Sequence, residues 1–215
     1  MQTEILKPTE ENLIRAGEMI KSGEIVAFPT ETVYGLGADG LNQAAREKIY
    51  LAKGRPSEKP LTLHVASLEQ AAKVAKISAA AEKLFEKFCP GPLTIILPKA
   101  ENLPDFAAKK TVGIRFPDNE VALKLIKISD CPIAAPSANI SGQAPPKNAQ
   151  DVLKNLGGKI PMILDGGECK FGISSTIIDL SEGEPKFLRI GAISIKELRE
   201  CWQASKKNFE IYKKT

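Results

Sequence analysis

The chain has 215 residues, of which 30 are lysine or arginine and 26 are aspartate or glutamate, so its net charge is +4. This length suits one large α/β unit with a continuous apolar core. The small positive excess does not by itself indicate a nucleic-acid-binding protein. We expect one domain over residues 1–205 and a basic C-terminal tail over residues 206–215.

The cysteines and the N-terminal residues bear on the compartment. The four cysteines are far apart and form no C-x-x-C pair, so neither a zinc knuckle nor a redox dithiol is indicated. The first ten residues lack the apolar core of a signal peptide, and no apolar run approaches the roughly 20 residues that span a bilayer. We expect a cytoplasmic protein without a membrane segment.

The first elements are a helix, a strand and a second helix. Thr9–Ser22 predicts a helix capped by its threonine, with Gly23 in the left-handed position after its end. Ile25–Phe28 is a short, continuously apolar run, which is typical of a strand buried on both faces. The segment PTETVYGLG then predicts a turn. Helical spacing resumes over Gln43–Ala52, and Pro56 prevents the helix from continuing.

The glycines of this turn allow two interpretations. Gly35–Gly40 matches G-x-G-x-x-G after a strand, a pattern found in dinucleotide-binding turns. We disfavour that match because Asn42 and Gln43 delay the helix, and because Glu58, about twenty positions on, lies in a cationic loop rather than at a strand end. The glycines therefore either let the chain turn or let a ligand approach the backbone.

The rest of the chain alternates between strands and helices. In Leu61–Val65 the aliphatic residues alternate with Thr62 and His64, so we expect a strand that buries its aliphatic face and turns His64 toward a cleft or solvent. Later strands are expected at Leu93–Leu97, Val112–Phe116, Ile133–Ala135, Met162–Leu164, Thr176–Leu180 and Lys186–Ile190. Helices are expected after the caps Ser67 and Ser78, over Asn119–Ser129 and Asn148–Leu156, and after a Ser194/Glu197 capping box.

This alternation predicts an α/β fold. Helices should flank a twisted sheet. Several strands follow short connections without a helix, so the sheet should be mixed parallel and antiparallel rather than purely parallel.

A cationic loop follows the second helix. Lys53, Arg55 and Lys59 lie within seven residues, with the first two at the fraying end of the helix, and Pro56 and Pro60 stiffen the turn. Three cations alone usually form a solvated loop. In an extended turn, however, Lys53 and Arg55 can point to the same side, and arginine binds phosphate through two parallel hydrogen bonds while lysine acts as a point charge. The loop therefore favours a polyphosphate ligand.

Other polar residues stand at strand ends or within apolar strands. Ser137 and Asn139 follow the strand ending at Ala135, where open α/β sheets place ligands, although an ordinary capping turn is an equal alternative. Ser137 is not expected to be a nucleophile, since there is no G-x-S-x-G motif. Arg115 lies in an apolar strand, either as an edge charge or as a carboxylate ligand in a cleft.

Taken together, the motifs PTETVYGLG, KGRP with a later KPL, LHV, GIRFP, PSANISG, SSTIIDL and LRIG resemble the YrdC/TsaC family of threonylcarbamoyl-AMP synthases. The resemblance runs from about Thr9 to Ile190. It implies a YrdC-like fold, a mixed α/β sheet around a basic cavity, in the short form without a further C-terminal domain. One departure is that Gln143-Ala144-Pro145-Pro146 lacks a hydroxyl residue that many members have there.

The resemblance also implies roles for individual residues. Catalytic roles fall to Lys53, Arg55, Ser137 and Asn139, with no residue binding a metal. Threonine is expected to contact Thr32, His64, Arg115 and Ser175. The nucleotide is expected to contact Arg55, Lys59, Thr111, Ser137 and Arg189.

The implied reaction joins L-threonine, bicarbonate and ATP into threonylcarbamoyl-adenylate and pyrophosphate, for threonylcarbamoyl-adenosine formation in tRNA. Mg²⁺ would arrive on the nucleotide phosphates. A tRNA threonylcarbamoyl transferase would take over the product, and contact with tRNA itself is a further expectation. Two alternatives stay open: an RNA-binding module without chemistry, and a carbamoyl-adenylate-forming domain like that of HypF-type proteins.

Overall fold

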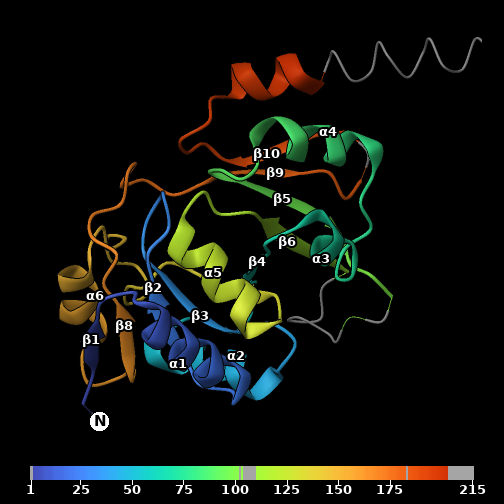
Figure 1. The fold of residues 1–215 in the computed structure, drawn as a ribbon. Coiled ribbons are helices and arrows are strands. Elements are labelled where there is room, and N and C mark those ends of the chain that lie inside the picture. Colours follow the sequence, from blue (N-terminus) through green and yellow to red (C-terminus); the bar gives the residue numbers. More distant parts are fainter. Residues whose placement is uncertain (1, 102, 104–109, 183, 203–215) are drawn as a thin grey trace, which may run out of the picture.

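The computed structural model describes residues 2–101, 103, 110–182 and 184–202. Its ten strands form one sheet, and helices lie against it (Figure 1). The strands are β1 (Glu4–Leu6), β2 (Val26–Phe28), β3 (Gly35–Asp39), β4 (Thr62–His64), β5 (Leu93–Pro98), β6 (Thr111–Arg115), β7 (Ile133–Ala134), β8 (Met162–Leu164), β9 (Thr176–Asp179) and β10 (Lys186–Arg189). The helices are α1 (Glu10–Lys21), α2 (Gln43–Lys53), α3 (Leu68–Ala72), α4 (Ala79–Phe88), α5 (Glu120–Ser129) and α6 (Ala149–Leu156), followed by a helix over residues 195–202.

The sheet is mixed, as the sequence predicts. Its order is β1-β8-β2-β3-β7-β4-β6-β5-β9-β10. The pairs β1–β8, β2–β8, β4–β6 and β5–β9 are parallel. The pairs β2–β3, β3–β7, β4–β7, β5–β6 and β9–β10 are antiparallel. Neighbouring strands thus come from distant parts of the chain, as where β8 lies between β1 and β2.

The helices begin where polar caps allow it. A side-chain oxygen of each N-cap accepts a hydrogen bond from the backbone N–H three residues on, which satisfies one of the free donors of the first turn. These caps are Thr9, Asn42, Ser67, Ser78, Asn119 and Asn148. The predicted Ser194/Glu197 capping box is also confirmed, because Ser194 and Glu197 each bond the other's backbone N–H.

The predicted turn over PTETVYGLG is partly right: residues 29–34 connect β2 with the next strand, whereas the glycines after them lie in that strand. Gly35–Asp39 forms β3 and pairs with β2 in an antiparallel hairpin. A Cβ atom on Gly37 would lie 2.6 Å from Phe28 Cε1 and 2.7 Å from Ile133 Cγ2. Glycine is therefore required there by side chains from neighbouring strands, which the local sequence does not reveal.

Sequence periodicity missed β1, whose three residues are held by pairing with β8, far along the chain. The expected basic tail over residues 206–215 lies outside the described residues.

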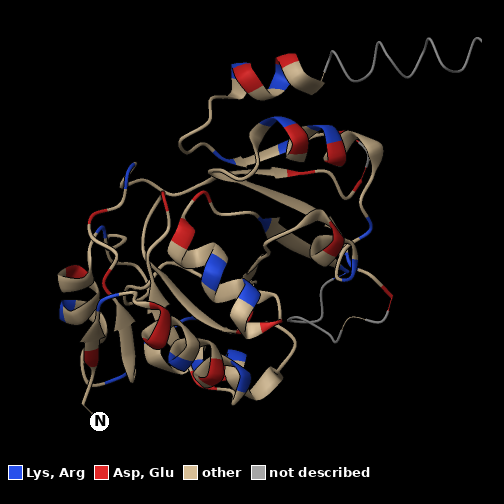
Figure 2. Cartoon of the chain, viewed as in Figure 1, with Lys and Arg blue, Asp and Glu red and all other residues tan. Residues whose placement is uncertain are grey.

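The apolar residues of the sheet fill two layers. On one face, Phe28 of β2 and Met162 of β8 pack with α1 and α5, which lie side by side in Figure 1. On the other face, a larger cluster joins α2, α4 and α6 to the sheet through residues such as Leu36, Leu63 and Ile114. The charged residues lie mostly on helices and loops, whereas the strands are largely uncharged (Figure 2).

Within the described residues, the helices are too short or too polar to cross a lipid bilayer. In the described part of the chain, none of the four cysteines, Cys89, Cys131, Cys169 and Cys201, forms a disulfide.

Candidate functional site

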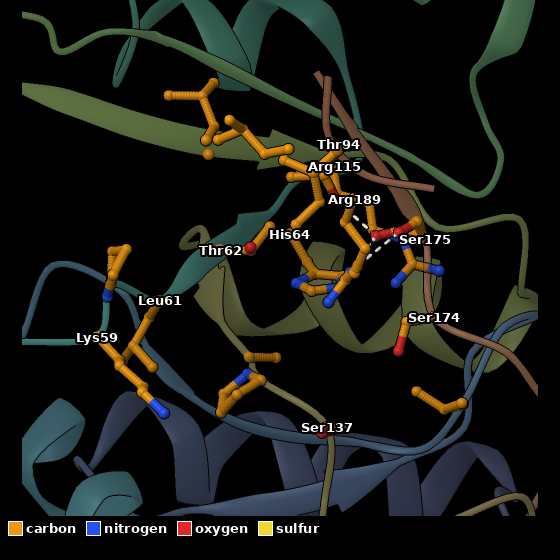
Figure 3. Close-up of a pocket in the computed structure, with 18 of the residues that line it drawn as sticks. Lys59, Leu61, Thr62, His64, Thr94, Arg115, Ser137, Ser174, Ser175 and Arg189 are labelled. Carbon is orange, nitrogen blue, oxygen red and sulfur yellow. Dashed lines mark hydrogen bonds between the residues drawn. The ribbon is translucent and has the colours of Figure 1, made fainter. Parts of the chain in front are cut away.

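A cavity of about 360 Å³ lies over one face of the neighbouring strands β4, β6, β5, β9 and β10 (Figure 3). The loops before β4 and β9 and the loop after β7 complete its wall. Its polar lining residues are Arg55, Lys59, Thr62, His64, Thr94, Thr111, Arg115, Ser137, Ser174, Ser175 and Arg189. We call the region of Thr94, His64, Arg115 and Ser175 the buried end and the region of Arg55 and Lys59 the open end.

Strand periodicity explains why this face is polar. In β4, Thr62 and His64 line the cavity while Leu63 packs in the core. In β6, Arg115 lines the cavity while Val112 and Ile114 pack in the core. Because successive side chains of a strand point to opposite faces, one short segment can serve both the core and the cavity. Of the two predicted environments of His64, a cleft or solvent, the structure shows the cleft.

Arg115 is the central charge of the buried end. Its Nη2 atom lies 3.0 Å from Glu31 Oε2, and it donates a hydrogen bond of 2.6 Å to Thr32 Oγ1. All three side chains are buried. Arg115 lies on β6, which is paired on both sides, so the interpretation as an edge charge is wrong. Glu31 and Thr32 stand behind Arg115 and fix its direction, and neither lines the cavity.

His64 is a neutral side chain at the buried end of the cavity. Burial, and then the positive charge of Arg115, lower the pKa of His64 to about 3. Its Nδ1 atom is buried and has no hydrogen-bond partner within the described residues. A neutral imidazole offers one donor and one acceptor, so His64 can bind a polar ligand without adding charge.

A hydroxyl pair lies beside Arg115. Thr94 Oγ1 and Ser175 Oγ are 2.8 Å apart. Arg189 donates through Nη2 to Ser175 Oγ at 3.0 Å and through Nε to the Ser175 carbonyl at 2.9 Å. One of the two hydroxyls donates its proton to the other, so the other hydroxyl can donate its own proton to a ligand. The arrangement therefore favours a hydrogen-bond acceptor, such as a carboxylate.

The two arginines near the buried end are close enough to repel each other. Partial burial, and then the charge of Arg115, lower the pKa of Arg189. Arg115 has the Glu31 carboxylate beside it, whereas no ion pair of Arg189 is found in the described residues. An anion in the cavity would relieve this repulsion.

The open end carries the cationic loop. Arg55 Nη2 donates to the Pro60 carbonyl at 2.9 Å, while its Nε atom is buried without a partner in the described structure. Tyr50 Oη donates to the Lys59 carbonyl at 2.9 Å, which fixes the loop to α2. Lys59 itself is exposed and reaches toward the cavity opposite Ser174 (Figure 3).

Lys53 lies behind this wall. The expectation that it sits at a fraying helix end is wrong, because α2 ends cleanly at Gly54 in a left-handed conformation and Lys53 is only 1% exposed. Its Nζ atom donates to the carbonyls of Ser137 and Asn139. Burial, and then the charge of Arg55, lower the pKa of Lys53 to about 8. Lys53 thus ties α2 to the loop that presents Ser137.

Asn139 has a similar place. Its Nδ2 atom donates to the carbonyls of Ile140 and Gln143, each at 2.8 Å. The side chain therefore holds its own loop in shape, and it does not line the cavity.

The structure brings eight of the expected site residues into one cavity wall: Arg55, Lys59, His64, Thr111, Arg115, Ser137, Ser175 and Arg189. Thr32, Lys53 and Asn139 stand one layer behind it. Sequence reasoning missed Thr94 as a lining residue and Glu31 as the partner of Arg115. The signal for Thr94 was present, since it is the one hydroxyl residue in the apolar run Leu93–Leu97.

The wall does not suit a metal ion held by the protein. None of its described lining residues is an aspartate or glutamate. The described residues also contain no group of three or more histidine, cysteine, aspartate or glutamate side chains placed to hold an ion. Since Mg²⁺ prefers oxygen ligands that include carboxylates, the donor set fits an anion and not a resident cation.

Comparison with known proteins identifies the family. The family model Sua5_yciO_yrdC, described as telomere recombination, matches residues 18–191. A curated threonylcarbamoyl-AMP synthase of Pyrococcus abyssi is 50% identical over 188 residues, which cover 86% of this chain and 55% of that protein. A curated threonylcarbamoyl-AMP synthase of Bacillus subtilis is 42% identical over 200 residues, which cover 91% of this chain and 58% of that protein.

Solved structures agree with this match. The crystal structure of P. abyssi Sua5 complexed with L-threonine is 46% identical, has a TM-score of 0.88, and is matched over 93% of this chain and 60% of that chain. A HypF structure has a TM-score of 0.72 at 22% identity, over 83% of this chain and 29% of that chain, which shows a shared fold. The chain spans about half the length of the curated relatives named above. On the match of the family model and of these relatives, the chain belongs to the Sua5/YciO/YrdC family.

Proposed function

We propose that the chain forms threonylcarbamoyl-AMP from L-threonine, bicarbonate and ATP, with release of pyrophosphate. The names of the curated relatives support this activity. The observation that carries it is the cavity itself, whose cations lie in two groups, Arg55 and Lys59 at the open end and Arg115 with Arg189 near the buried end. Two anionic substrates that must react with each other need such an arrangement.

The proposed chemistry needs no protein nucleophile. The threonine amine and bicarbonate give an N-carboxylate and water. An oxygen of that carboxylate forms a bond to the α-phosphorus of ATP, and the bond from phosphorus to the pyrophosphate oxygen breaks. The protein then acts by holding the two substrates in line and by stabilising negative charge on the leaving pyrophosphate.

At the buried end, Arg115 and the Thr94–Ser175 pair are suited to hold the carboxylate of threonine, with Thr32 orienting Arg115. His64 orients the amino acid and does not remove its proton, because a group with a pKa of about 3 is a weak base near neutral pH. Arg189, near this end, adds positive charge.

At the open end, we assign the phosphates to Arg55 and Lys59, with hydroxyls from Thr111 and Ser137. Lys53 and Asn139 support Ser137 from behind. That Lys53 also stabilises phosphate charge stays a prediction, since two backbone carbonyls already accept from its ammonium group. Mg²⁺ would enter as part of the ATP substrate, coordinated by phosphates and water.

The product would pass to an enzyme that transfers the threonylcarbamoyl group to adenosine in tRNA, and direct tRNA contact is part of the same proposal. A cytoplasmic location agrees with the lack of a disulfide among Cys89, Cys131, Cys169 and Cys201 in the described structure.

The deciding experiment supplies the protein with ATP, Mg²⁺ and bicarbonate and adds one amino acid at a time. Pyrophosphate release should require threonine and bicarbonate together. Release with no amino acid, or with carbamoyl phosphate in place of both, would point to the HypF-like alternative. Salt-sensitive RNA binding without any turnover would support the RNA-binding alternative.

A further inference from the structure

One glycine of the cavity wall has no structural reason to be glycine. Gly113 lies in the interior of β6, where glycine usually weakens a strand. Every other glycine that the structure describes, apart from Gly35, either has a positive φ or would place a Cβ atom within 3.0 Å of another atom. Gly35 differs from Gly113 in being buried rather than half-buried, with the Phe28 ring 3.4 Å and Ala135 Cβ 3.5 Å from the position of an added Cβ atom.

Gly113 has neither constraint. Its φ is in the ordinary range, and a Cβ atom there would lie 3.4 Å from Thr94 Cγ2, 3.5 Å from Thr62 Oγ1 and 3.9 Å from Ile96 Cγ1. These are ordinary van der Waals distances. The residue is half-buried and lines the cavity, so the added atom would point into the space above the sheet.

The register of the sheet places Gly113 between the two ends of the cavity. Arg115 pairs with His64 on one side and Thr94 on the other, and this row forms the buried end. Gly113 pairs with Thr62 and Ile96 in the next row. Thr111 lies one row further, toward the cationic loop that precedes β4. Same-face residues of a strand are roughly 7 Å apart, so the row of Gly113 lies about 7 Å from the row of Arg115 and about 7 Å from the row of Thr111.

We propose that the bare backbone at Gly113 is the place where the two substrates meet, with the reacting carboxylate and the α-phosphate lying directly over β6. This inference rests on the proposed function. An amino acid anchored at Arg115 and a triphosphate anchored at Arg55 and Lys59 have to join over the middle row. A methyl group on residue 113 would occupy the space in which the new oxygen–phosphorus bond forms. Gly113 thus determines the space available for the reaction and contributes no group of its own.

The test is the variant Gly113→Ala. Its unfolding temperature should equal or exceed that of the wild type, because alanine fits the site and suits a strand better. Its kcat for threonine-dependent pyrophosphate release should fall about 10- to 100-fold, since a displacement of about 1 Å at the reacting atoms has an effect of that size. The KM values for ATP and threonine should change less than about threefold, since each substrate keeps its own anchors.

Two further variants separate the ligand from protein crowding. Gly113→Ser has nearly the size of alanine and should behave like it, whereas Gly113→Val should lose more activity. The double variant Gly113→Ala/Thr94→Ser removes the protein atom nearest to the new methyl group. Compared with Thr94→Ser alone, the double variant should stay as impaired as Gly113→Ala is relative to the wild type.

Each contrary result would overturn the proposal. Unchanged turnover in Gly113→Ala would show that nothing reacts there, and a large fall in unfolding temperature would show that the position has no room for a methyl group. Restored turnover in the double variant would assign the loss to Thr94. A raised KM for threonine alone, with kcat unchanged, would place Gly113 in the amino-acid subsite. Wild-type protein that binds ATP but makes no adenylate would instead refute the proposed function. Even then, a lower affinity for ATP in Gly113→Ala would contradict this inference, because ATP would lie over residue 113 itself and not only at the open end.

Discussion

His64 makes the stability of the protein depend on pH. Its folded pKa of about 3 is below the value of about 6.5 expected in the unfolded chain, so the unfolded state binds the extra proton first as the pH falls. Stability is then fully present above pH 6.5 and is lost as the pH falls from about 6.5 toward 3, by at most about 1.4 kcal/mol per pH unit.

Urea unfolding at pH 7, 6 and 5 checks this. The variant His64→Gln cannot titrate there, so its free energy of unfolding should fall less steeply with decreasing pH than that of the wild type. Since all carboxylates are shared by the two proteins, the difference between their slopes isolates His64. Equal slopes would contradict the neutral, buried state of the imidazole.

Glu31 should matter more for stability than any exposed carboxylate. The Arg115–Glu31 pair is 7% and 2% exposed at its two side chains, so loss of the carboxylate leaves a buried guanidinium without its counter-charge. Glu31→Gln should lower the free energy of unfolding by about 3 kcal/mol. The control is Glu4→Gln, which breaks the Arg15–Glu4 pair with side chains 48% and 43% exposed and should leave stability nearly unchanged. Similar losses in both variants would contradict this account.

Much of the residue-level site could be predicted from the sequence. Period-two alternation in Leu61–Val65 correctly placed Thr62 and His64 on the face opposite the aliphatic core, because strand geometry alone decides which face a side chain takes. The buried partners could not be predicted in the same way. Glu31 and Arg115 meet across 84 positions of sequence only because β2, β3, β7, β4 and β6 assemble in that order.

At the scale of elements, Lys53 connects α2 with the loop after β7. Lys53→Met keeps the length and apolar stem of the side chain but removes the ammonium group that bonds the Ser137 and Asn139 carbonyls. The Asn139 carbonyl would then lose its donor, whereas the Ser137 carbonyl would keep the Asn139 N–H at 3.0 Å, so the cost should be about 2 kcal/mol. Amide hydrogen exchange should also become faster at Ser141, whose N–H donates to the Lys53 carbonyl at 2.9 Å.

The matched control is Lys48→Met on the same helix. Lys48 pairs with Glu24 at 2.7 Å, and both side chains are about two-fifths exposed, so this variant should leave exchange at Ser141 unchanged. If both variants or neither speeded exchange at Ser141, the proposed link between helix and loop would be wrong.

Elements were predictable where their own sequence decided them. The helix caps and the mixed sheet followed from local patterns. β3 could not be predicted in this way, because Gly37 is required by the Phe28 ring and Ile133 on neighbouring strands and not by a turn. β1 could not either, since three residues carry too little periodicity and only β8 makes them a strand.

For the whole molecule, ATP should act as a stabilising ligand if the proposed function is right. At 100 times its Kd, a ligand of the folded state adds about 2.7 kcal/mol to the free energy of unfolding. The double variant Arg55→Ala/Lys59→Ala should lose most of this gain. The control Lys124→Ala/Lys154→Ala removes the same charge from exposed positions on α5 and α6 and should retain it. Equal gains in both double variants would mean that net charge, and not the open end of the cavity, binds ATP.

The order of the strands also affects how the protein matures. One side of the hollow comes from the loop that carries Arg55 and another from β10, which carries Arg189, and the strands between them are added in a sequence unlike their spatial order. A growing chain on the ribosome therefore has no complete cavity until β10 has left the exit tunnel. A ligand of this cavity therefore cannot guide the early steps of folding, and any protection that it gives begins only after Arg189 has emerged.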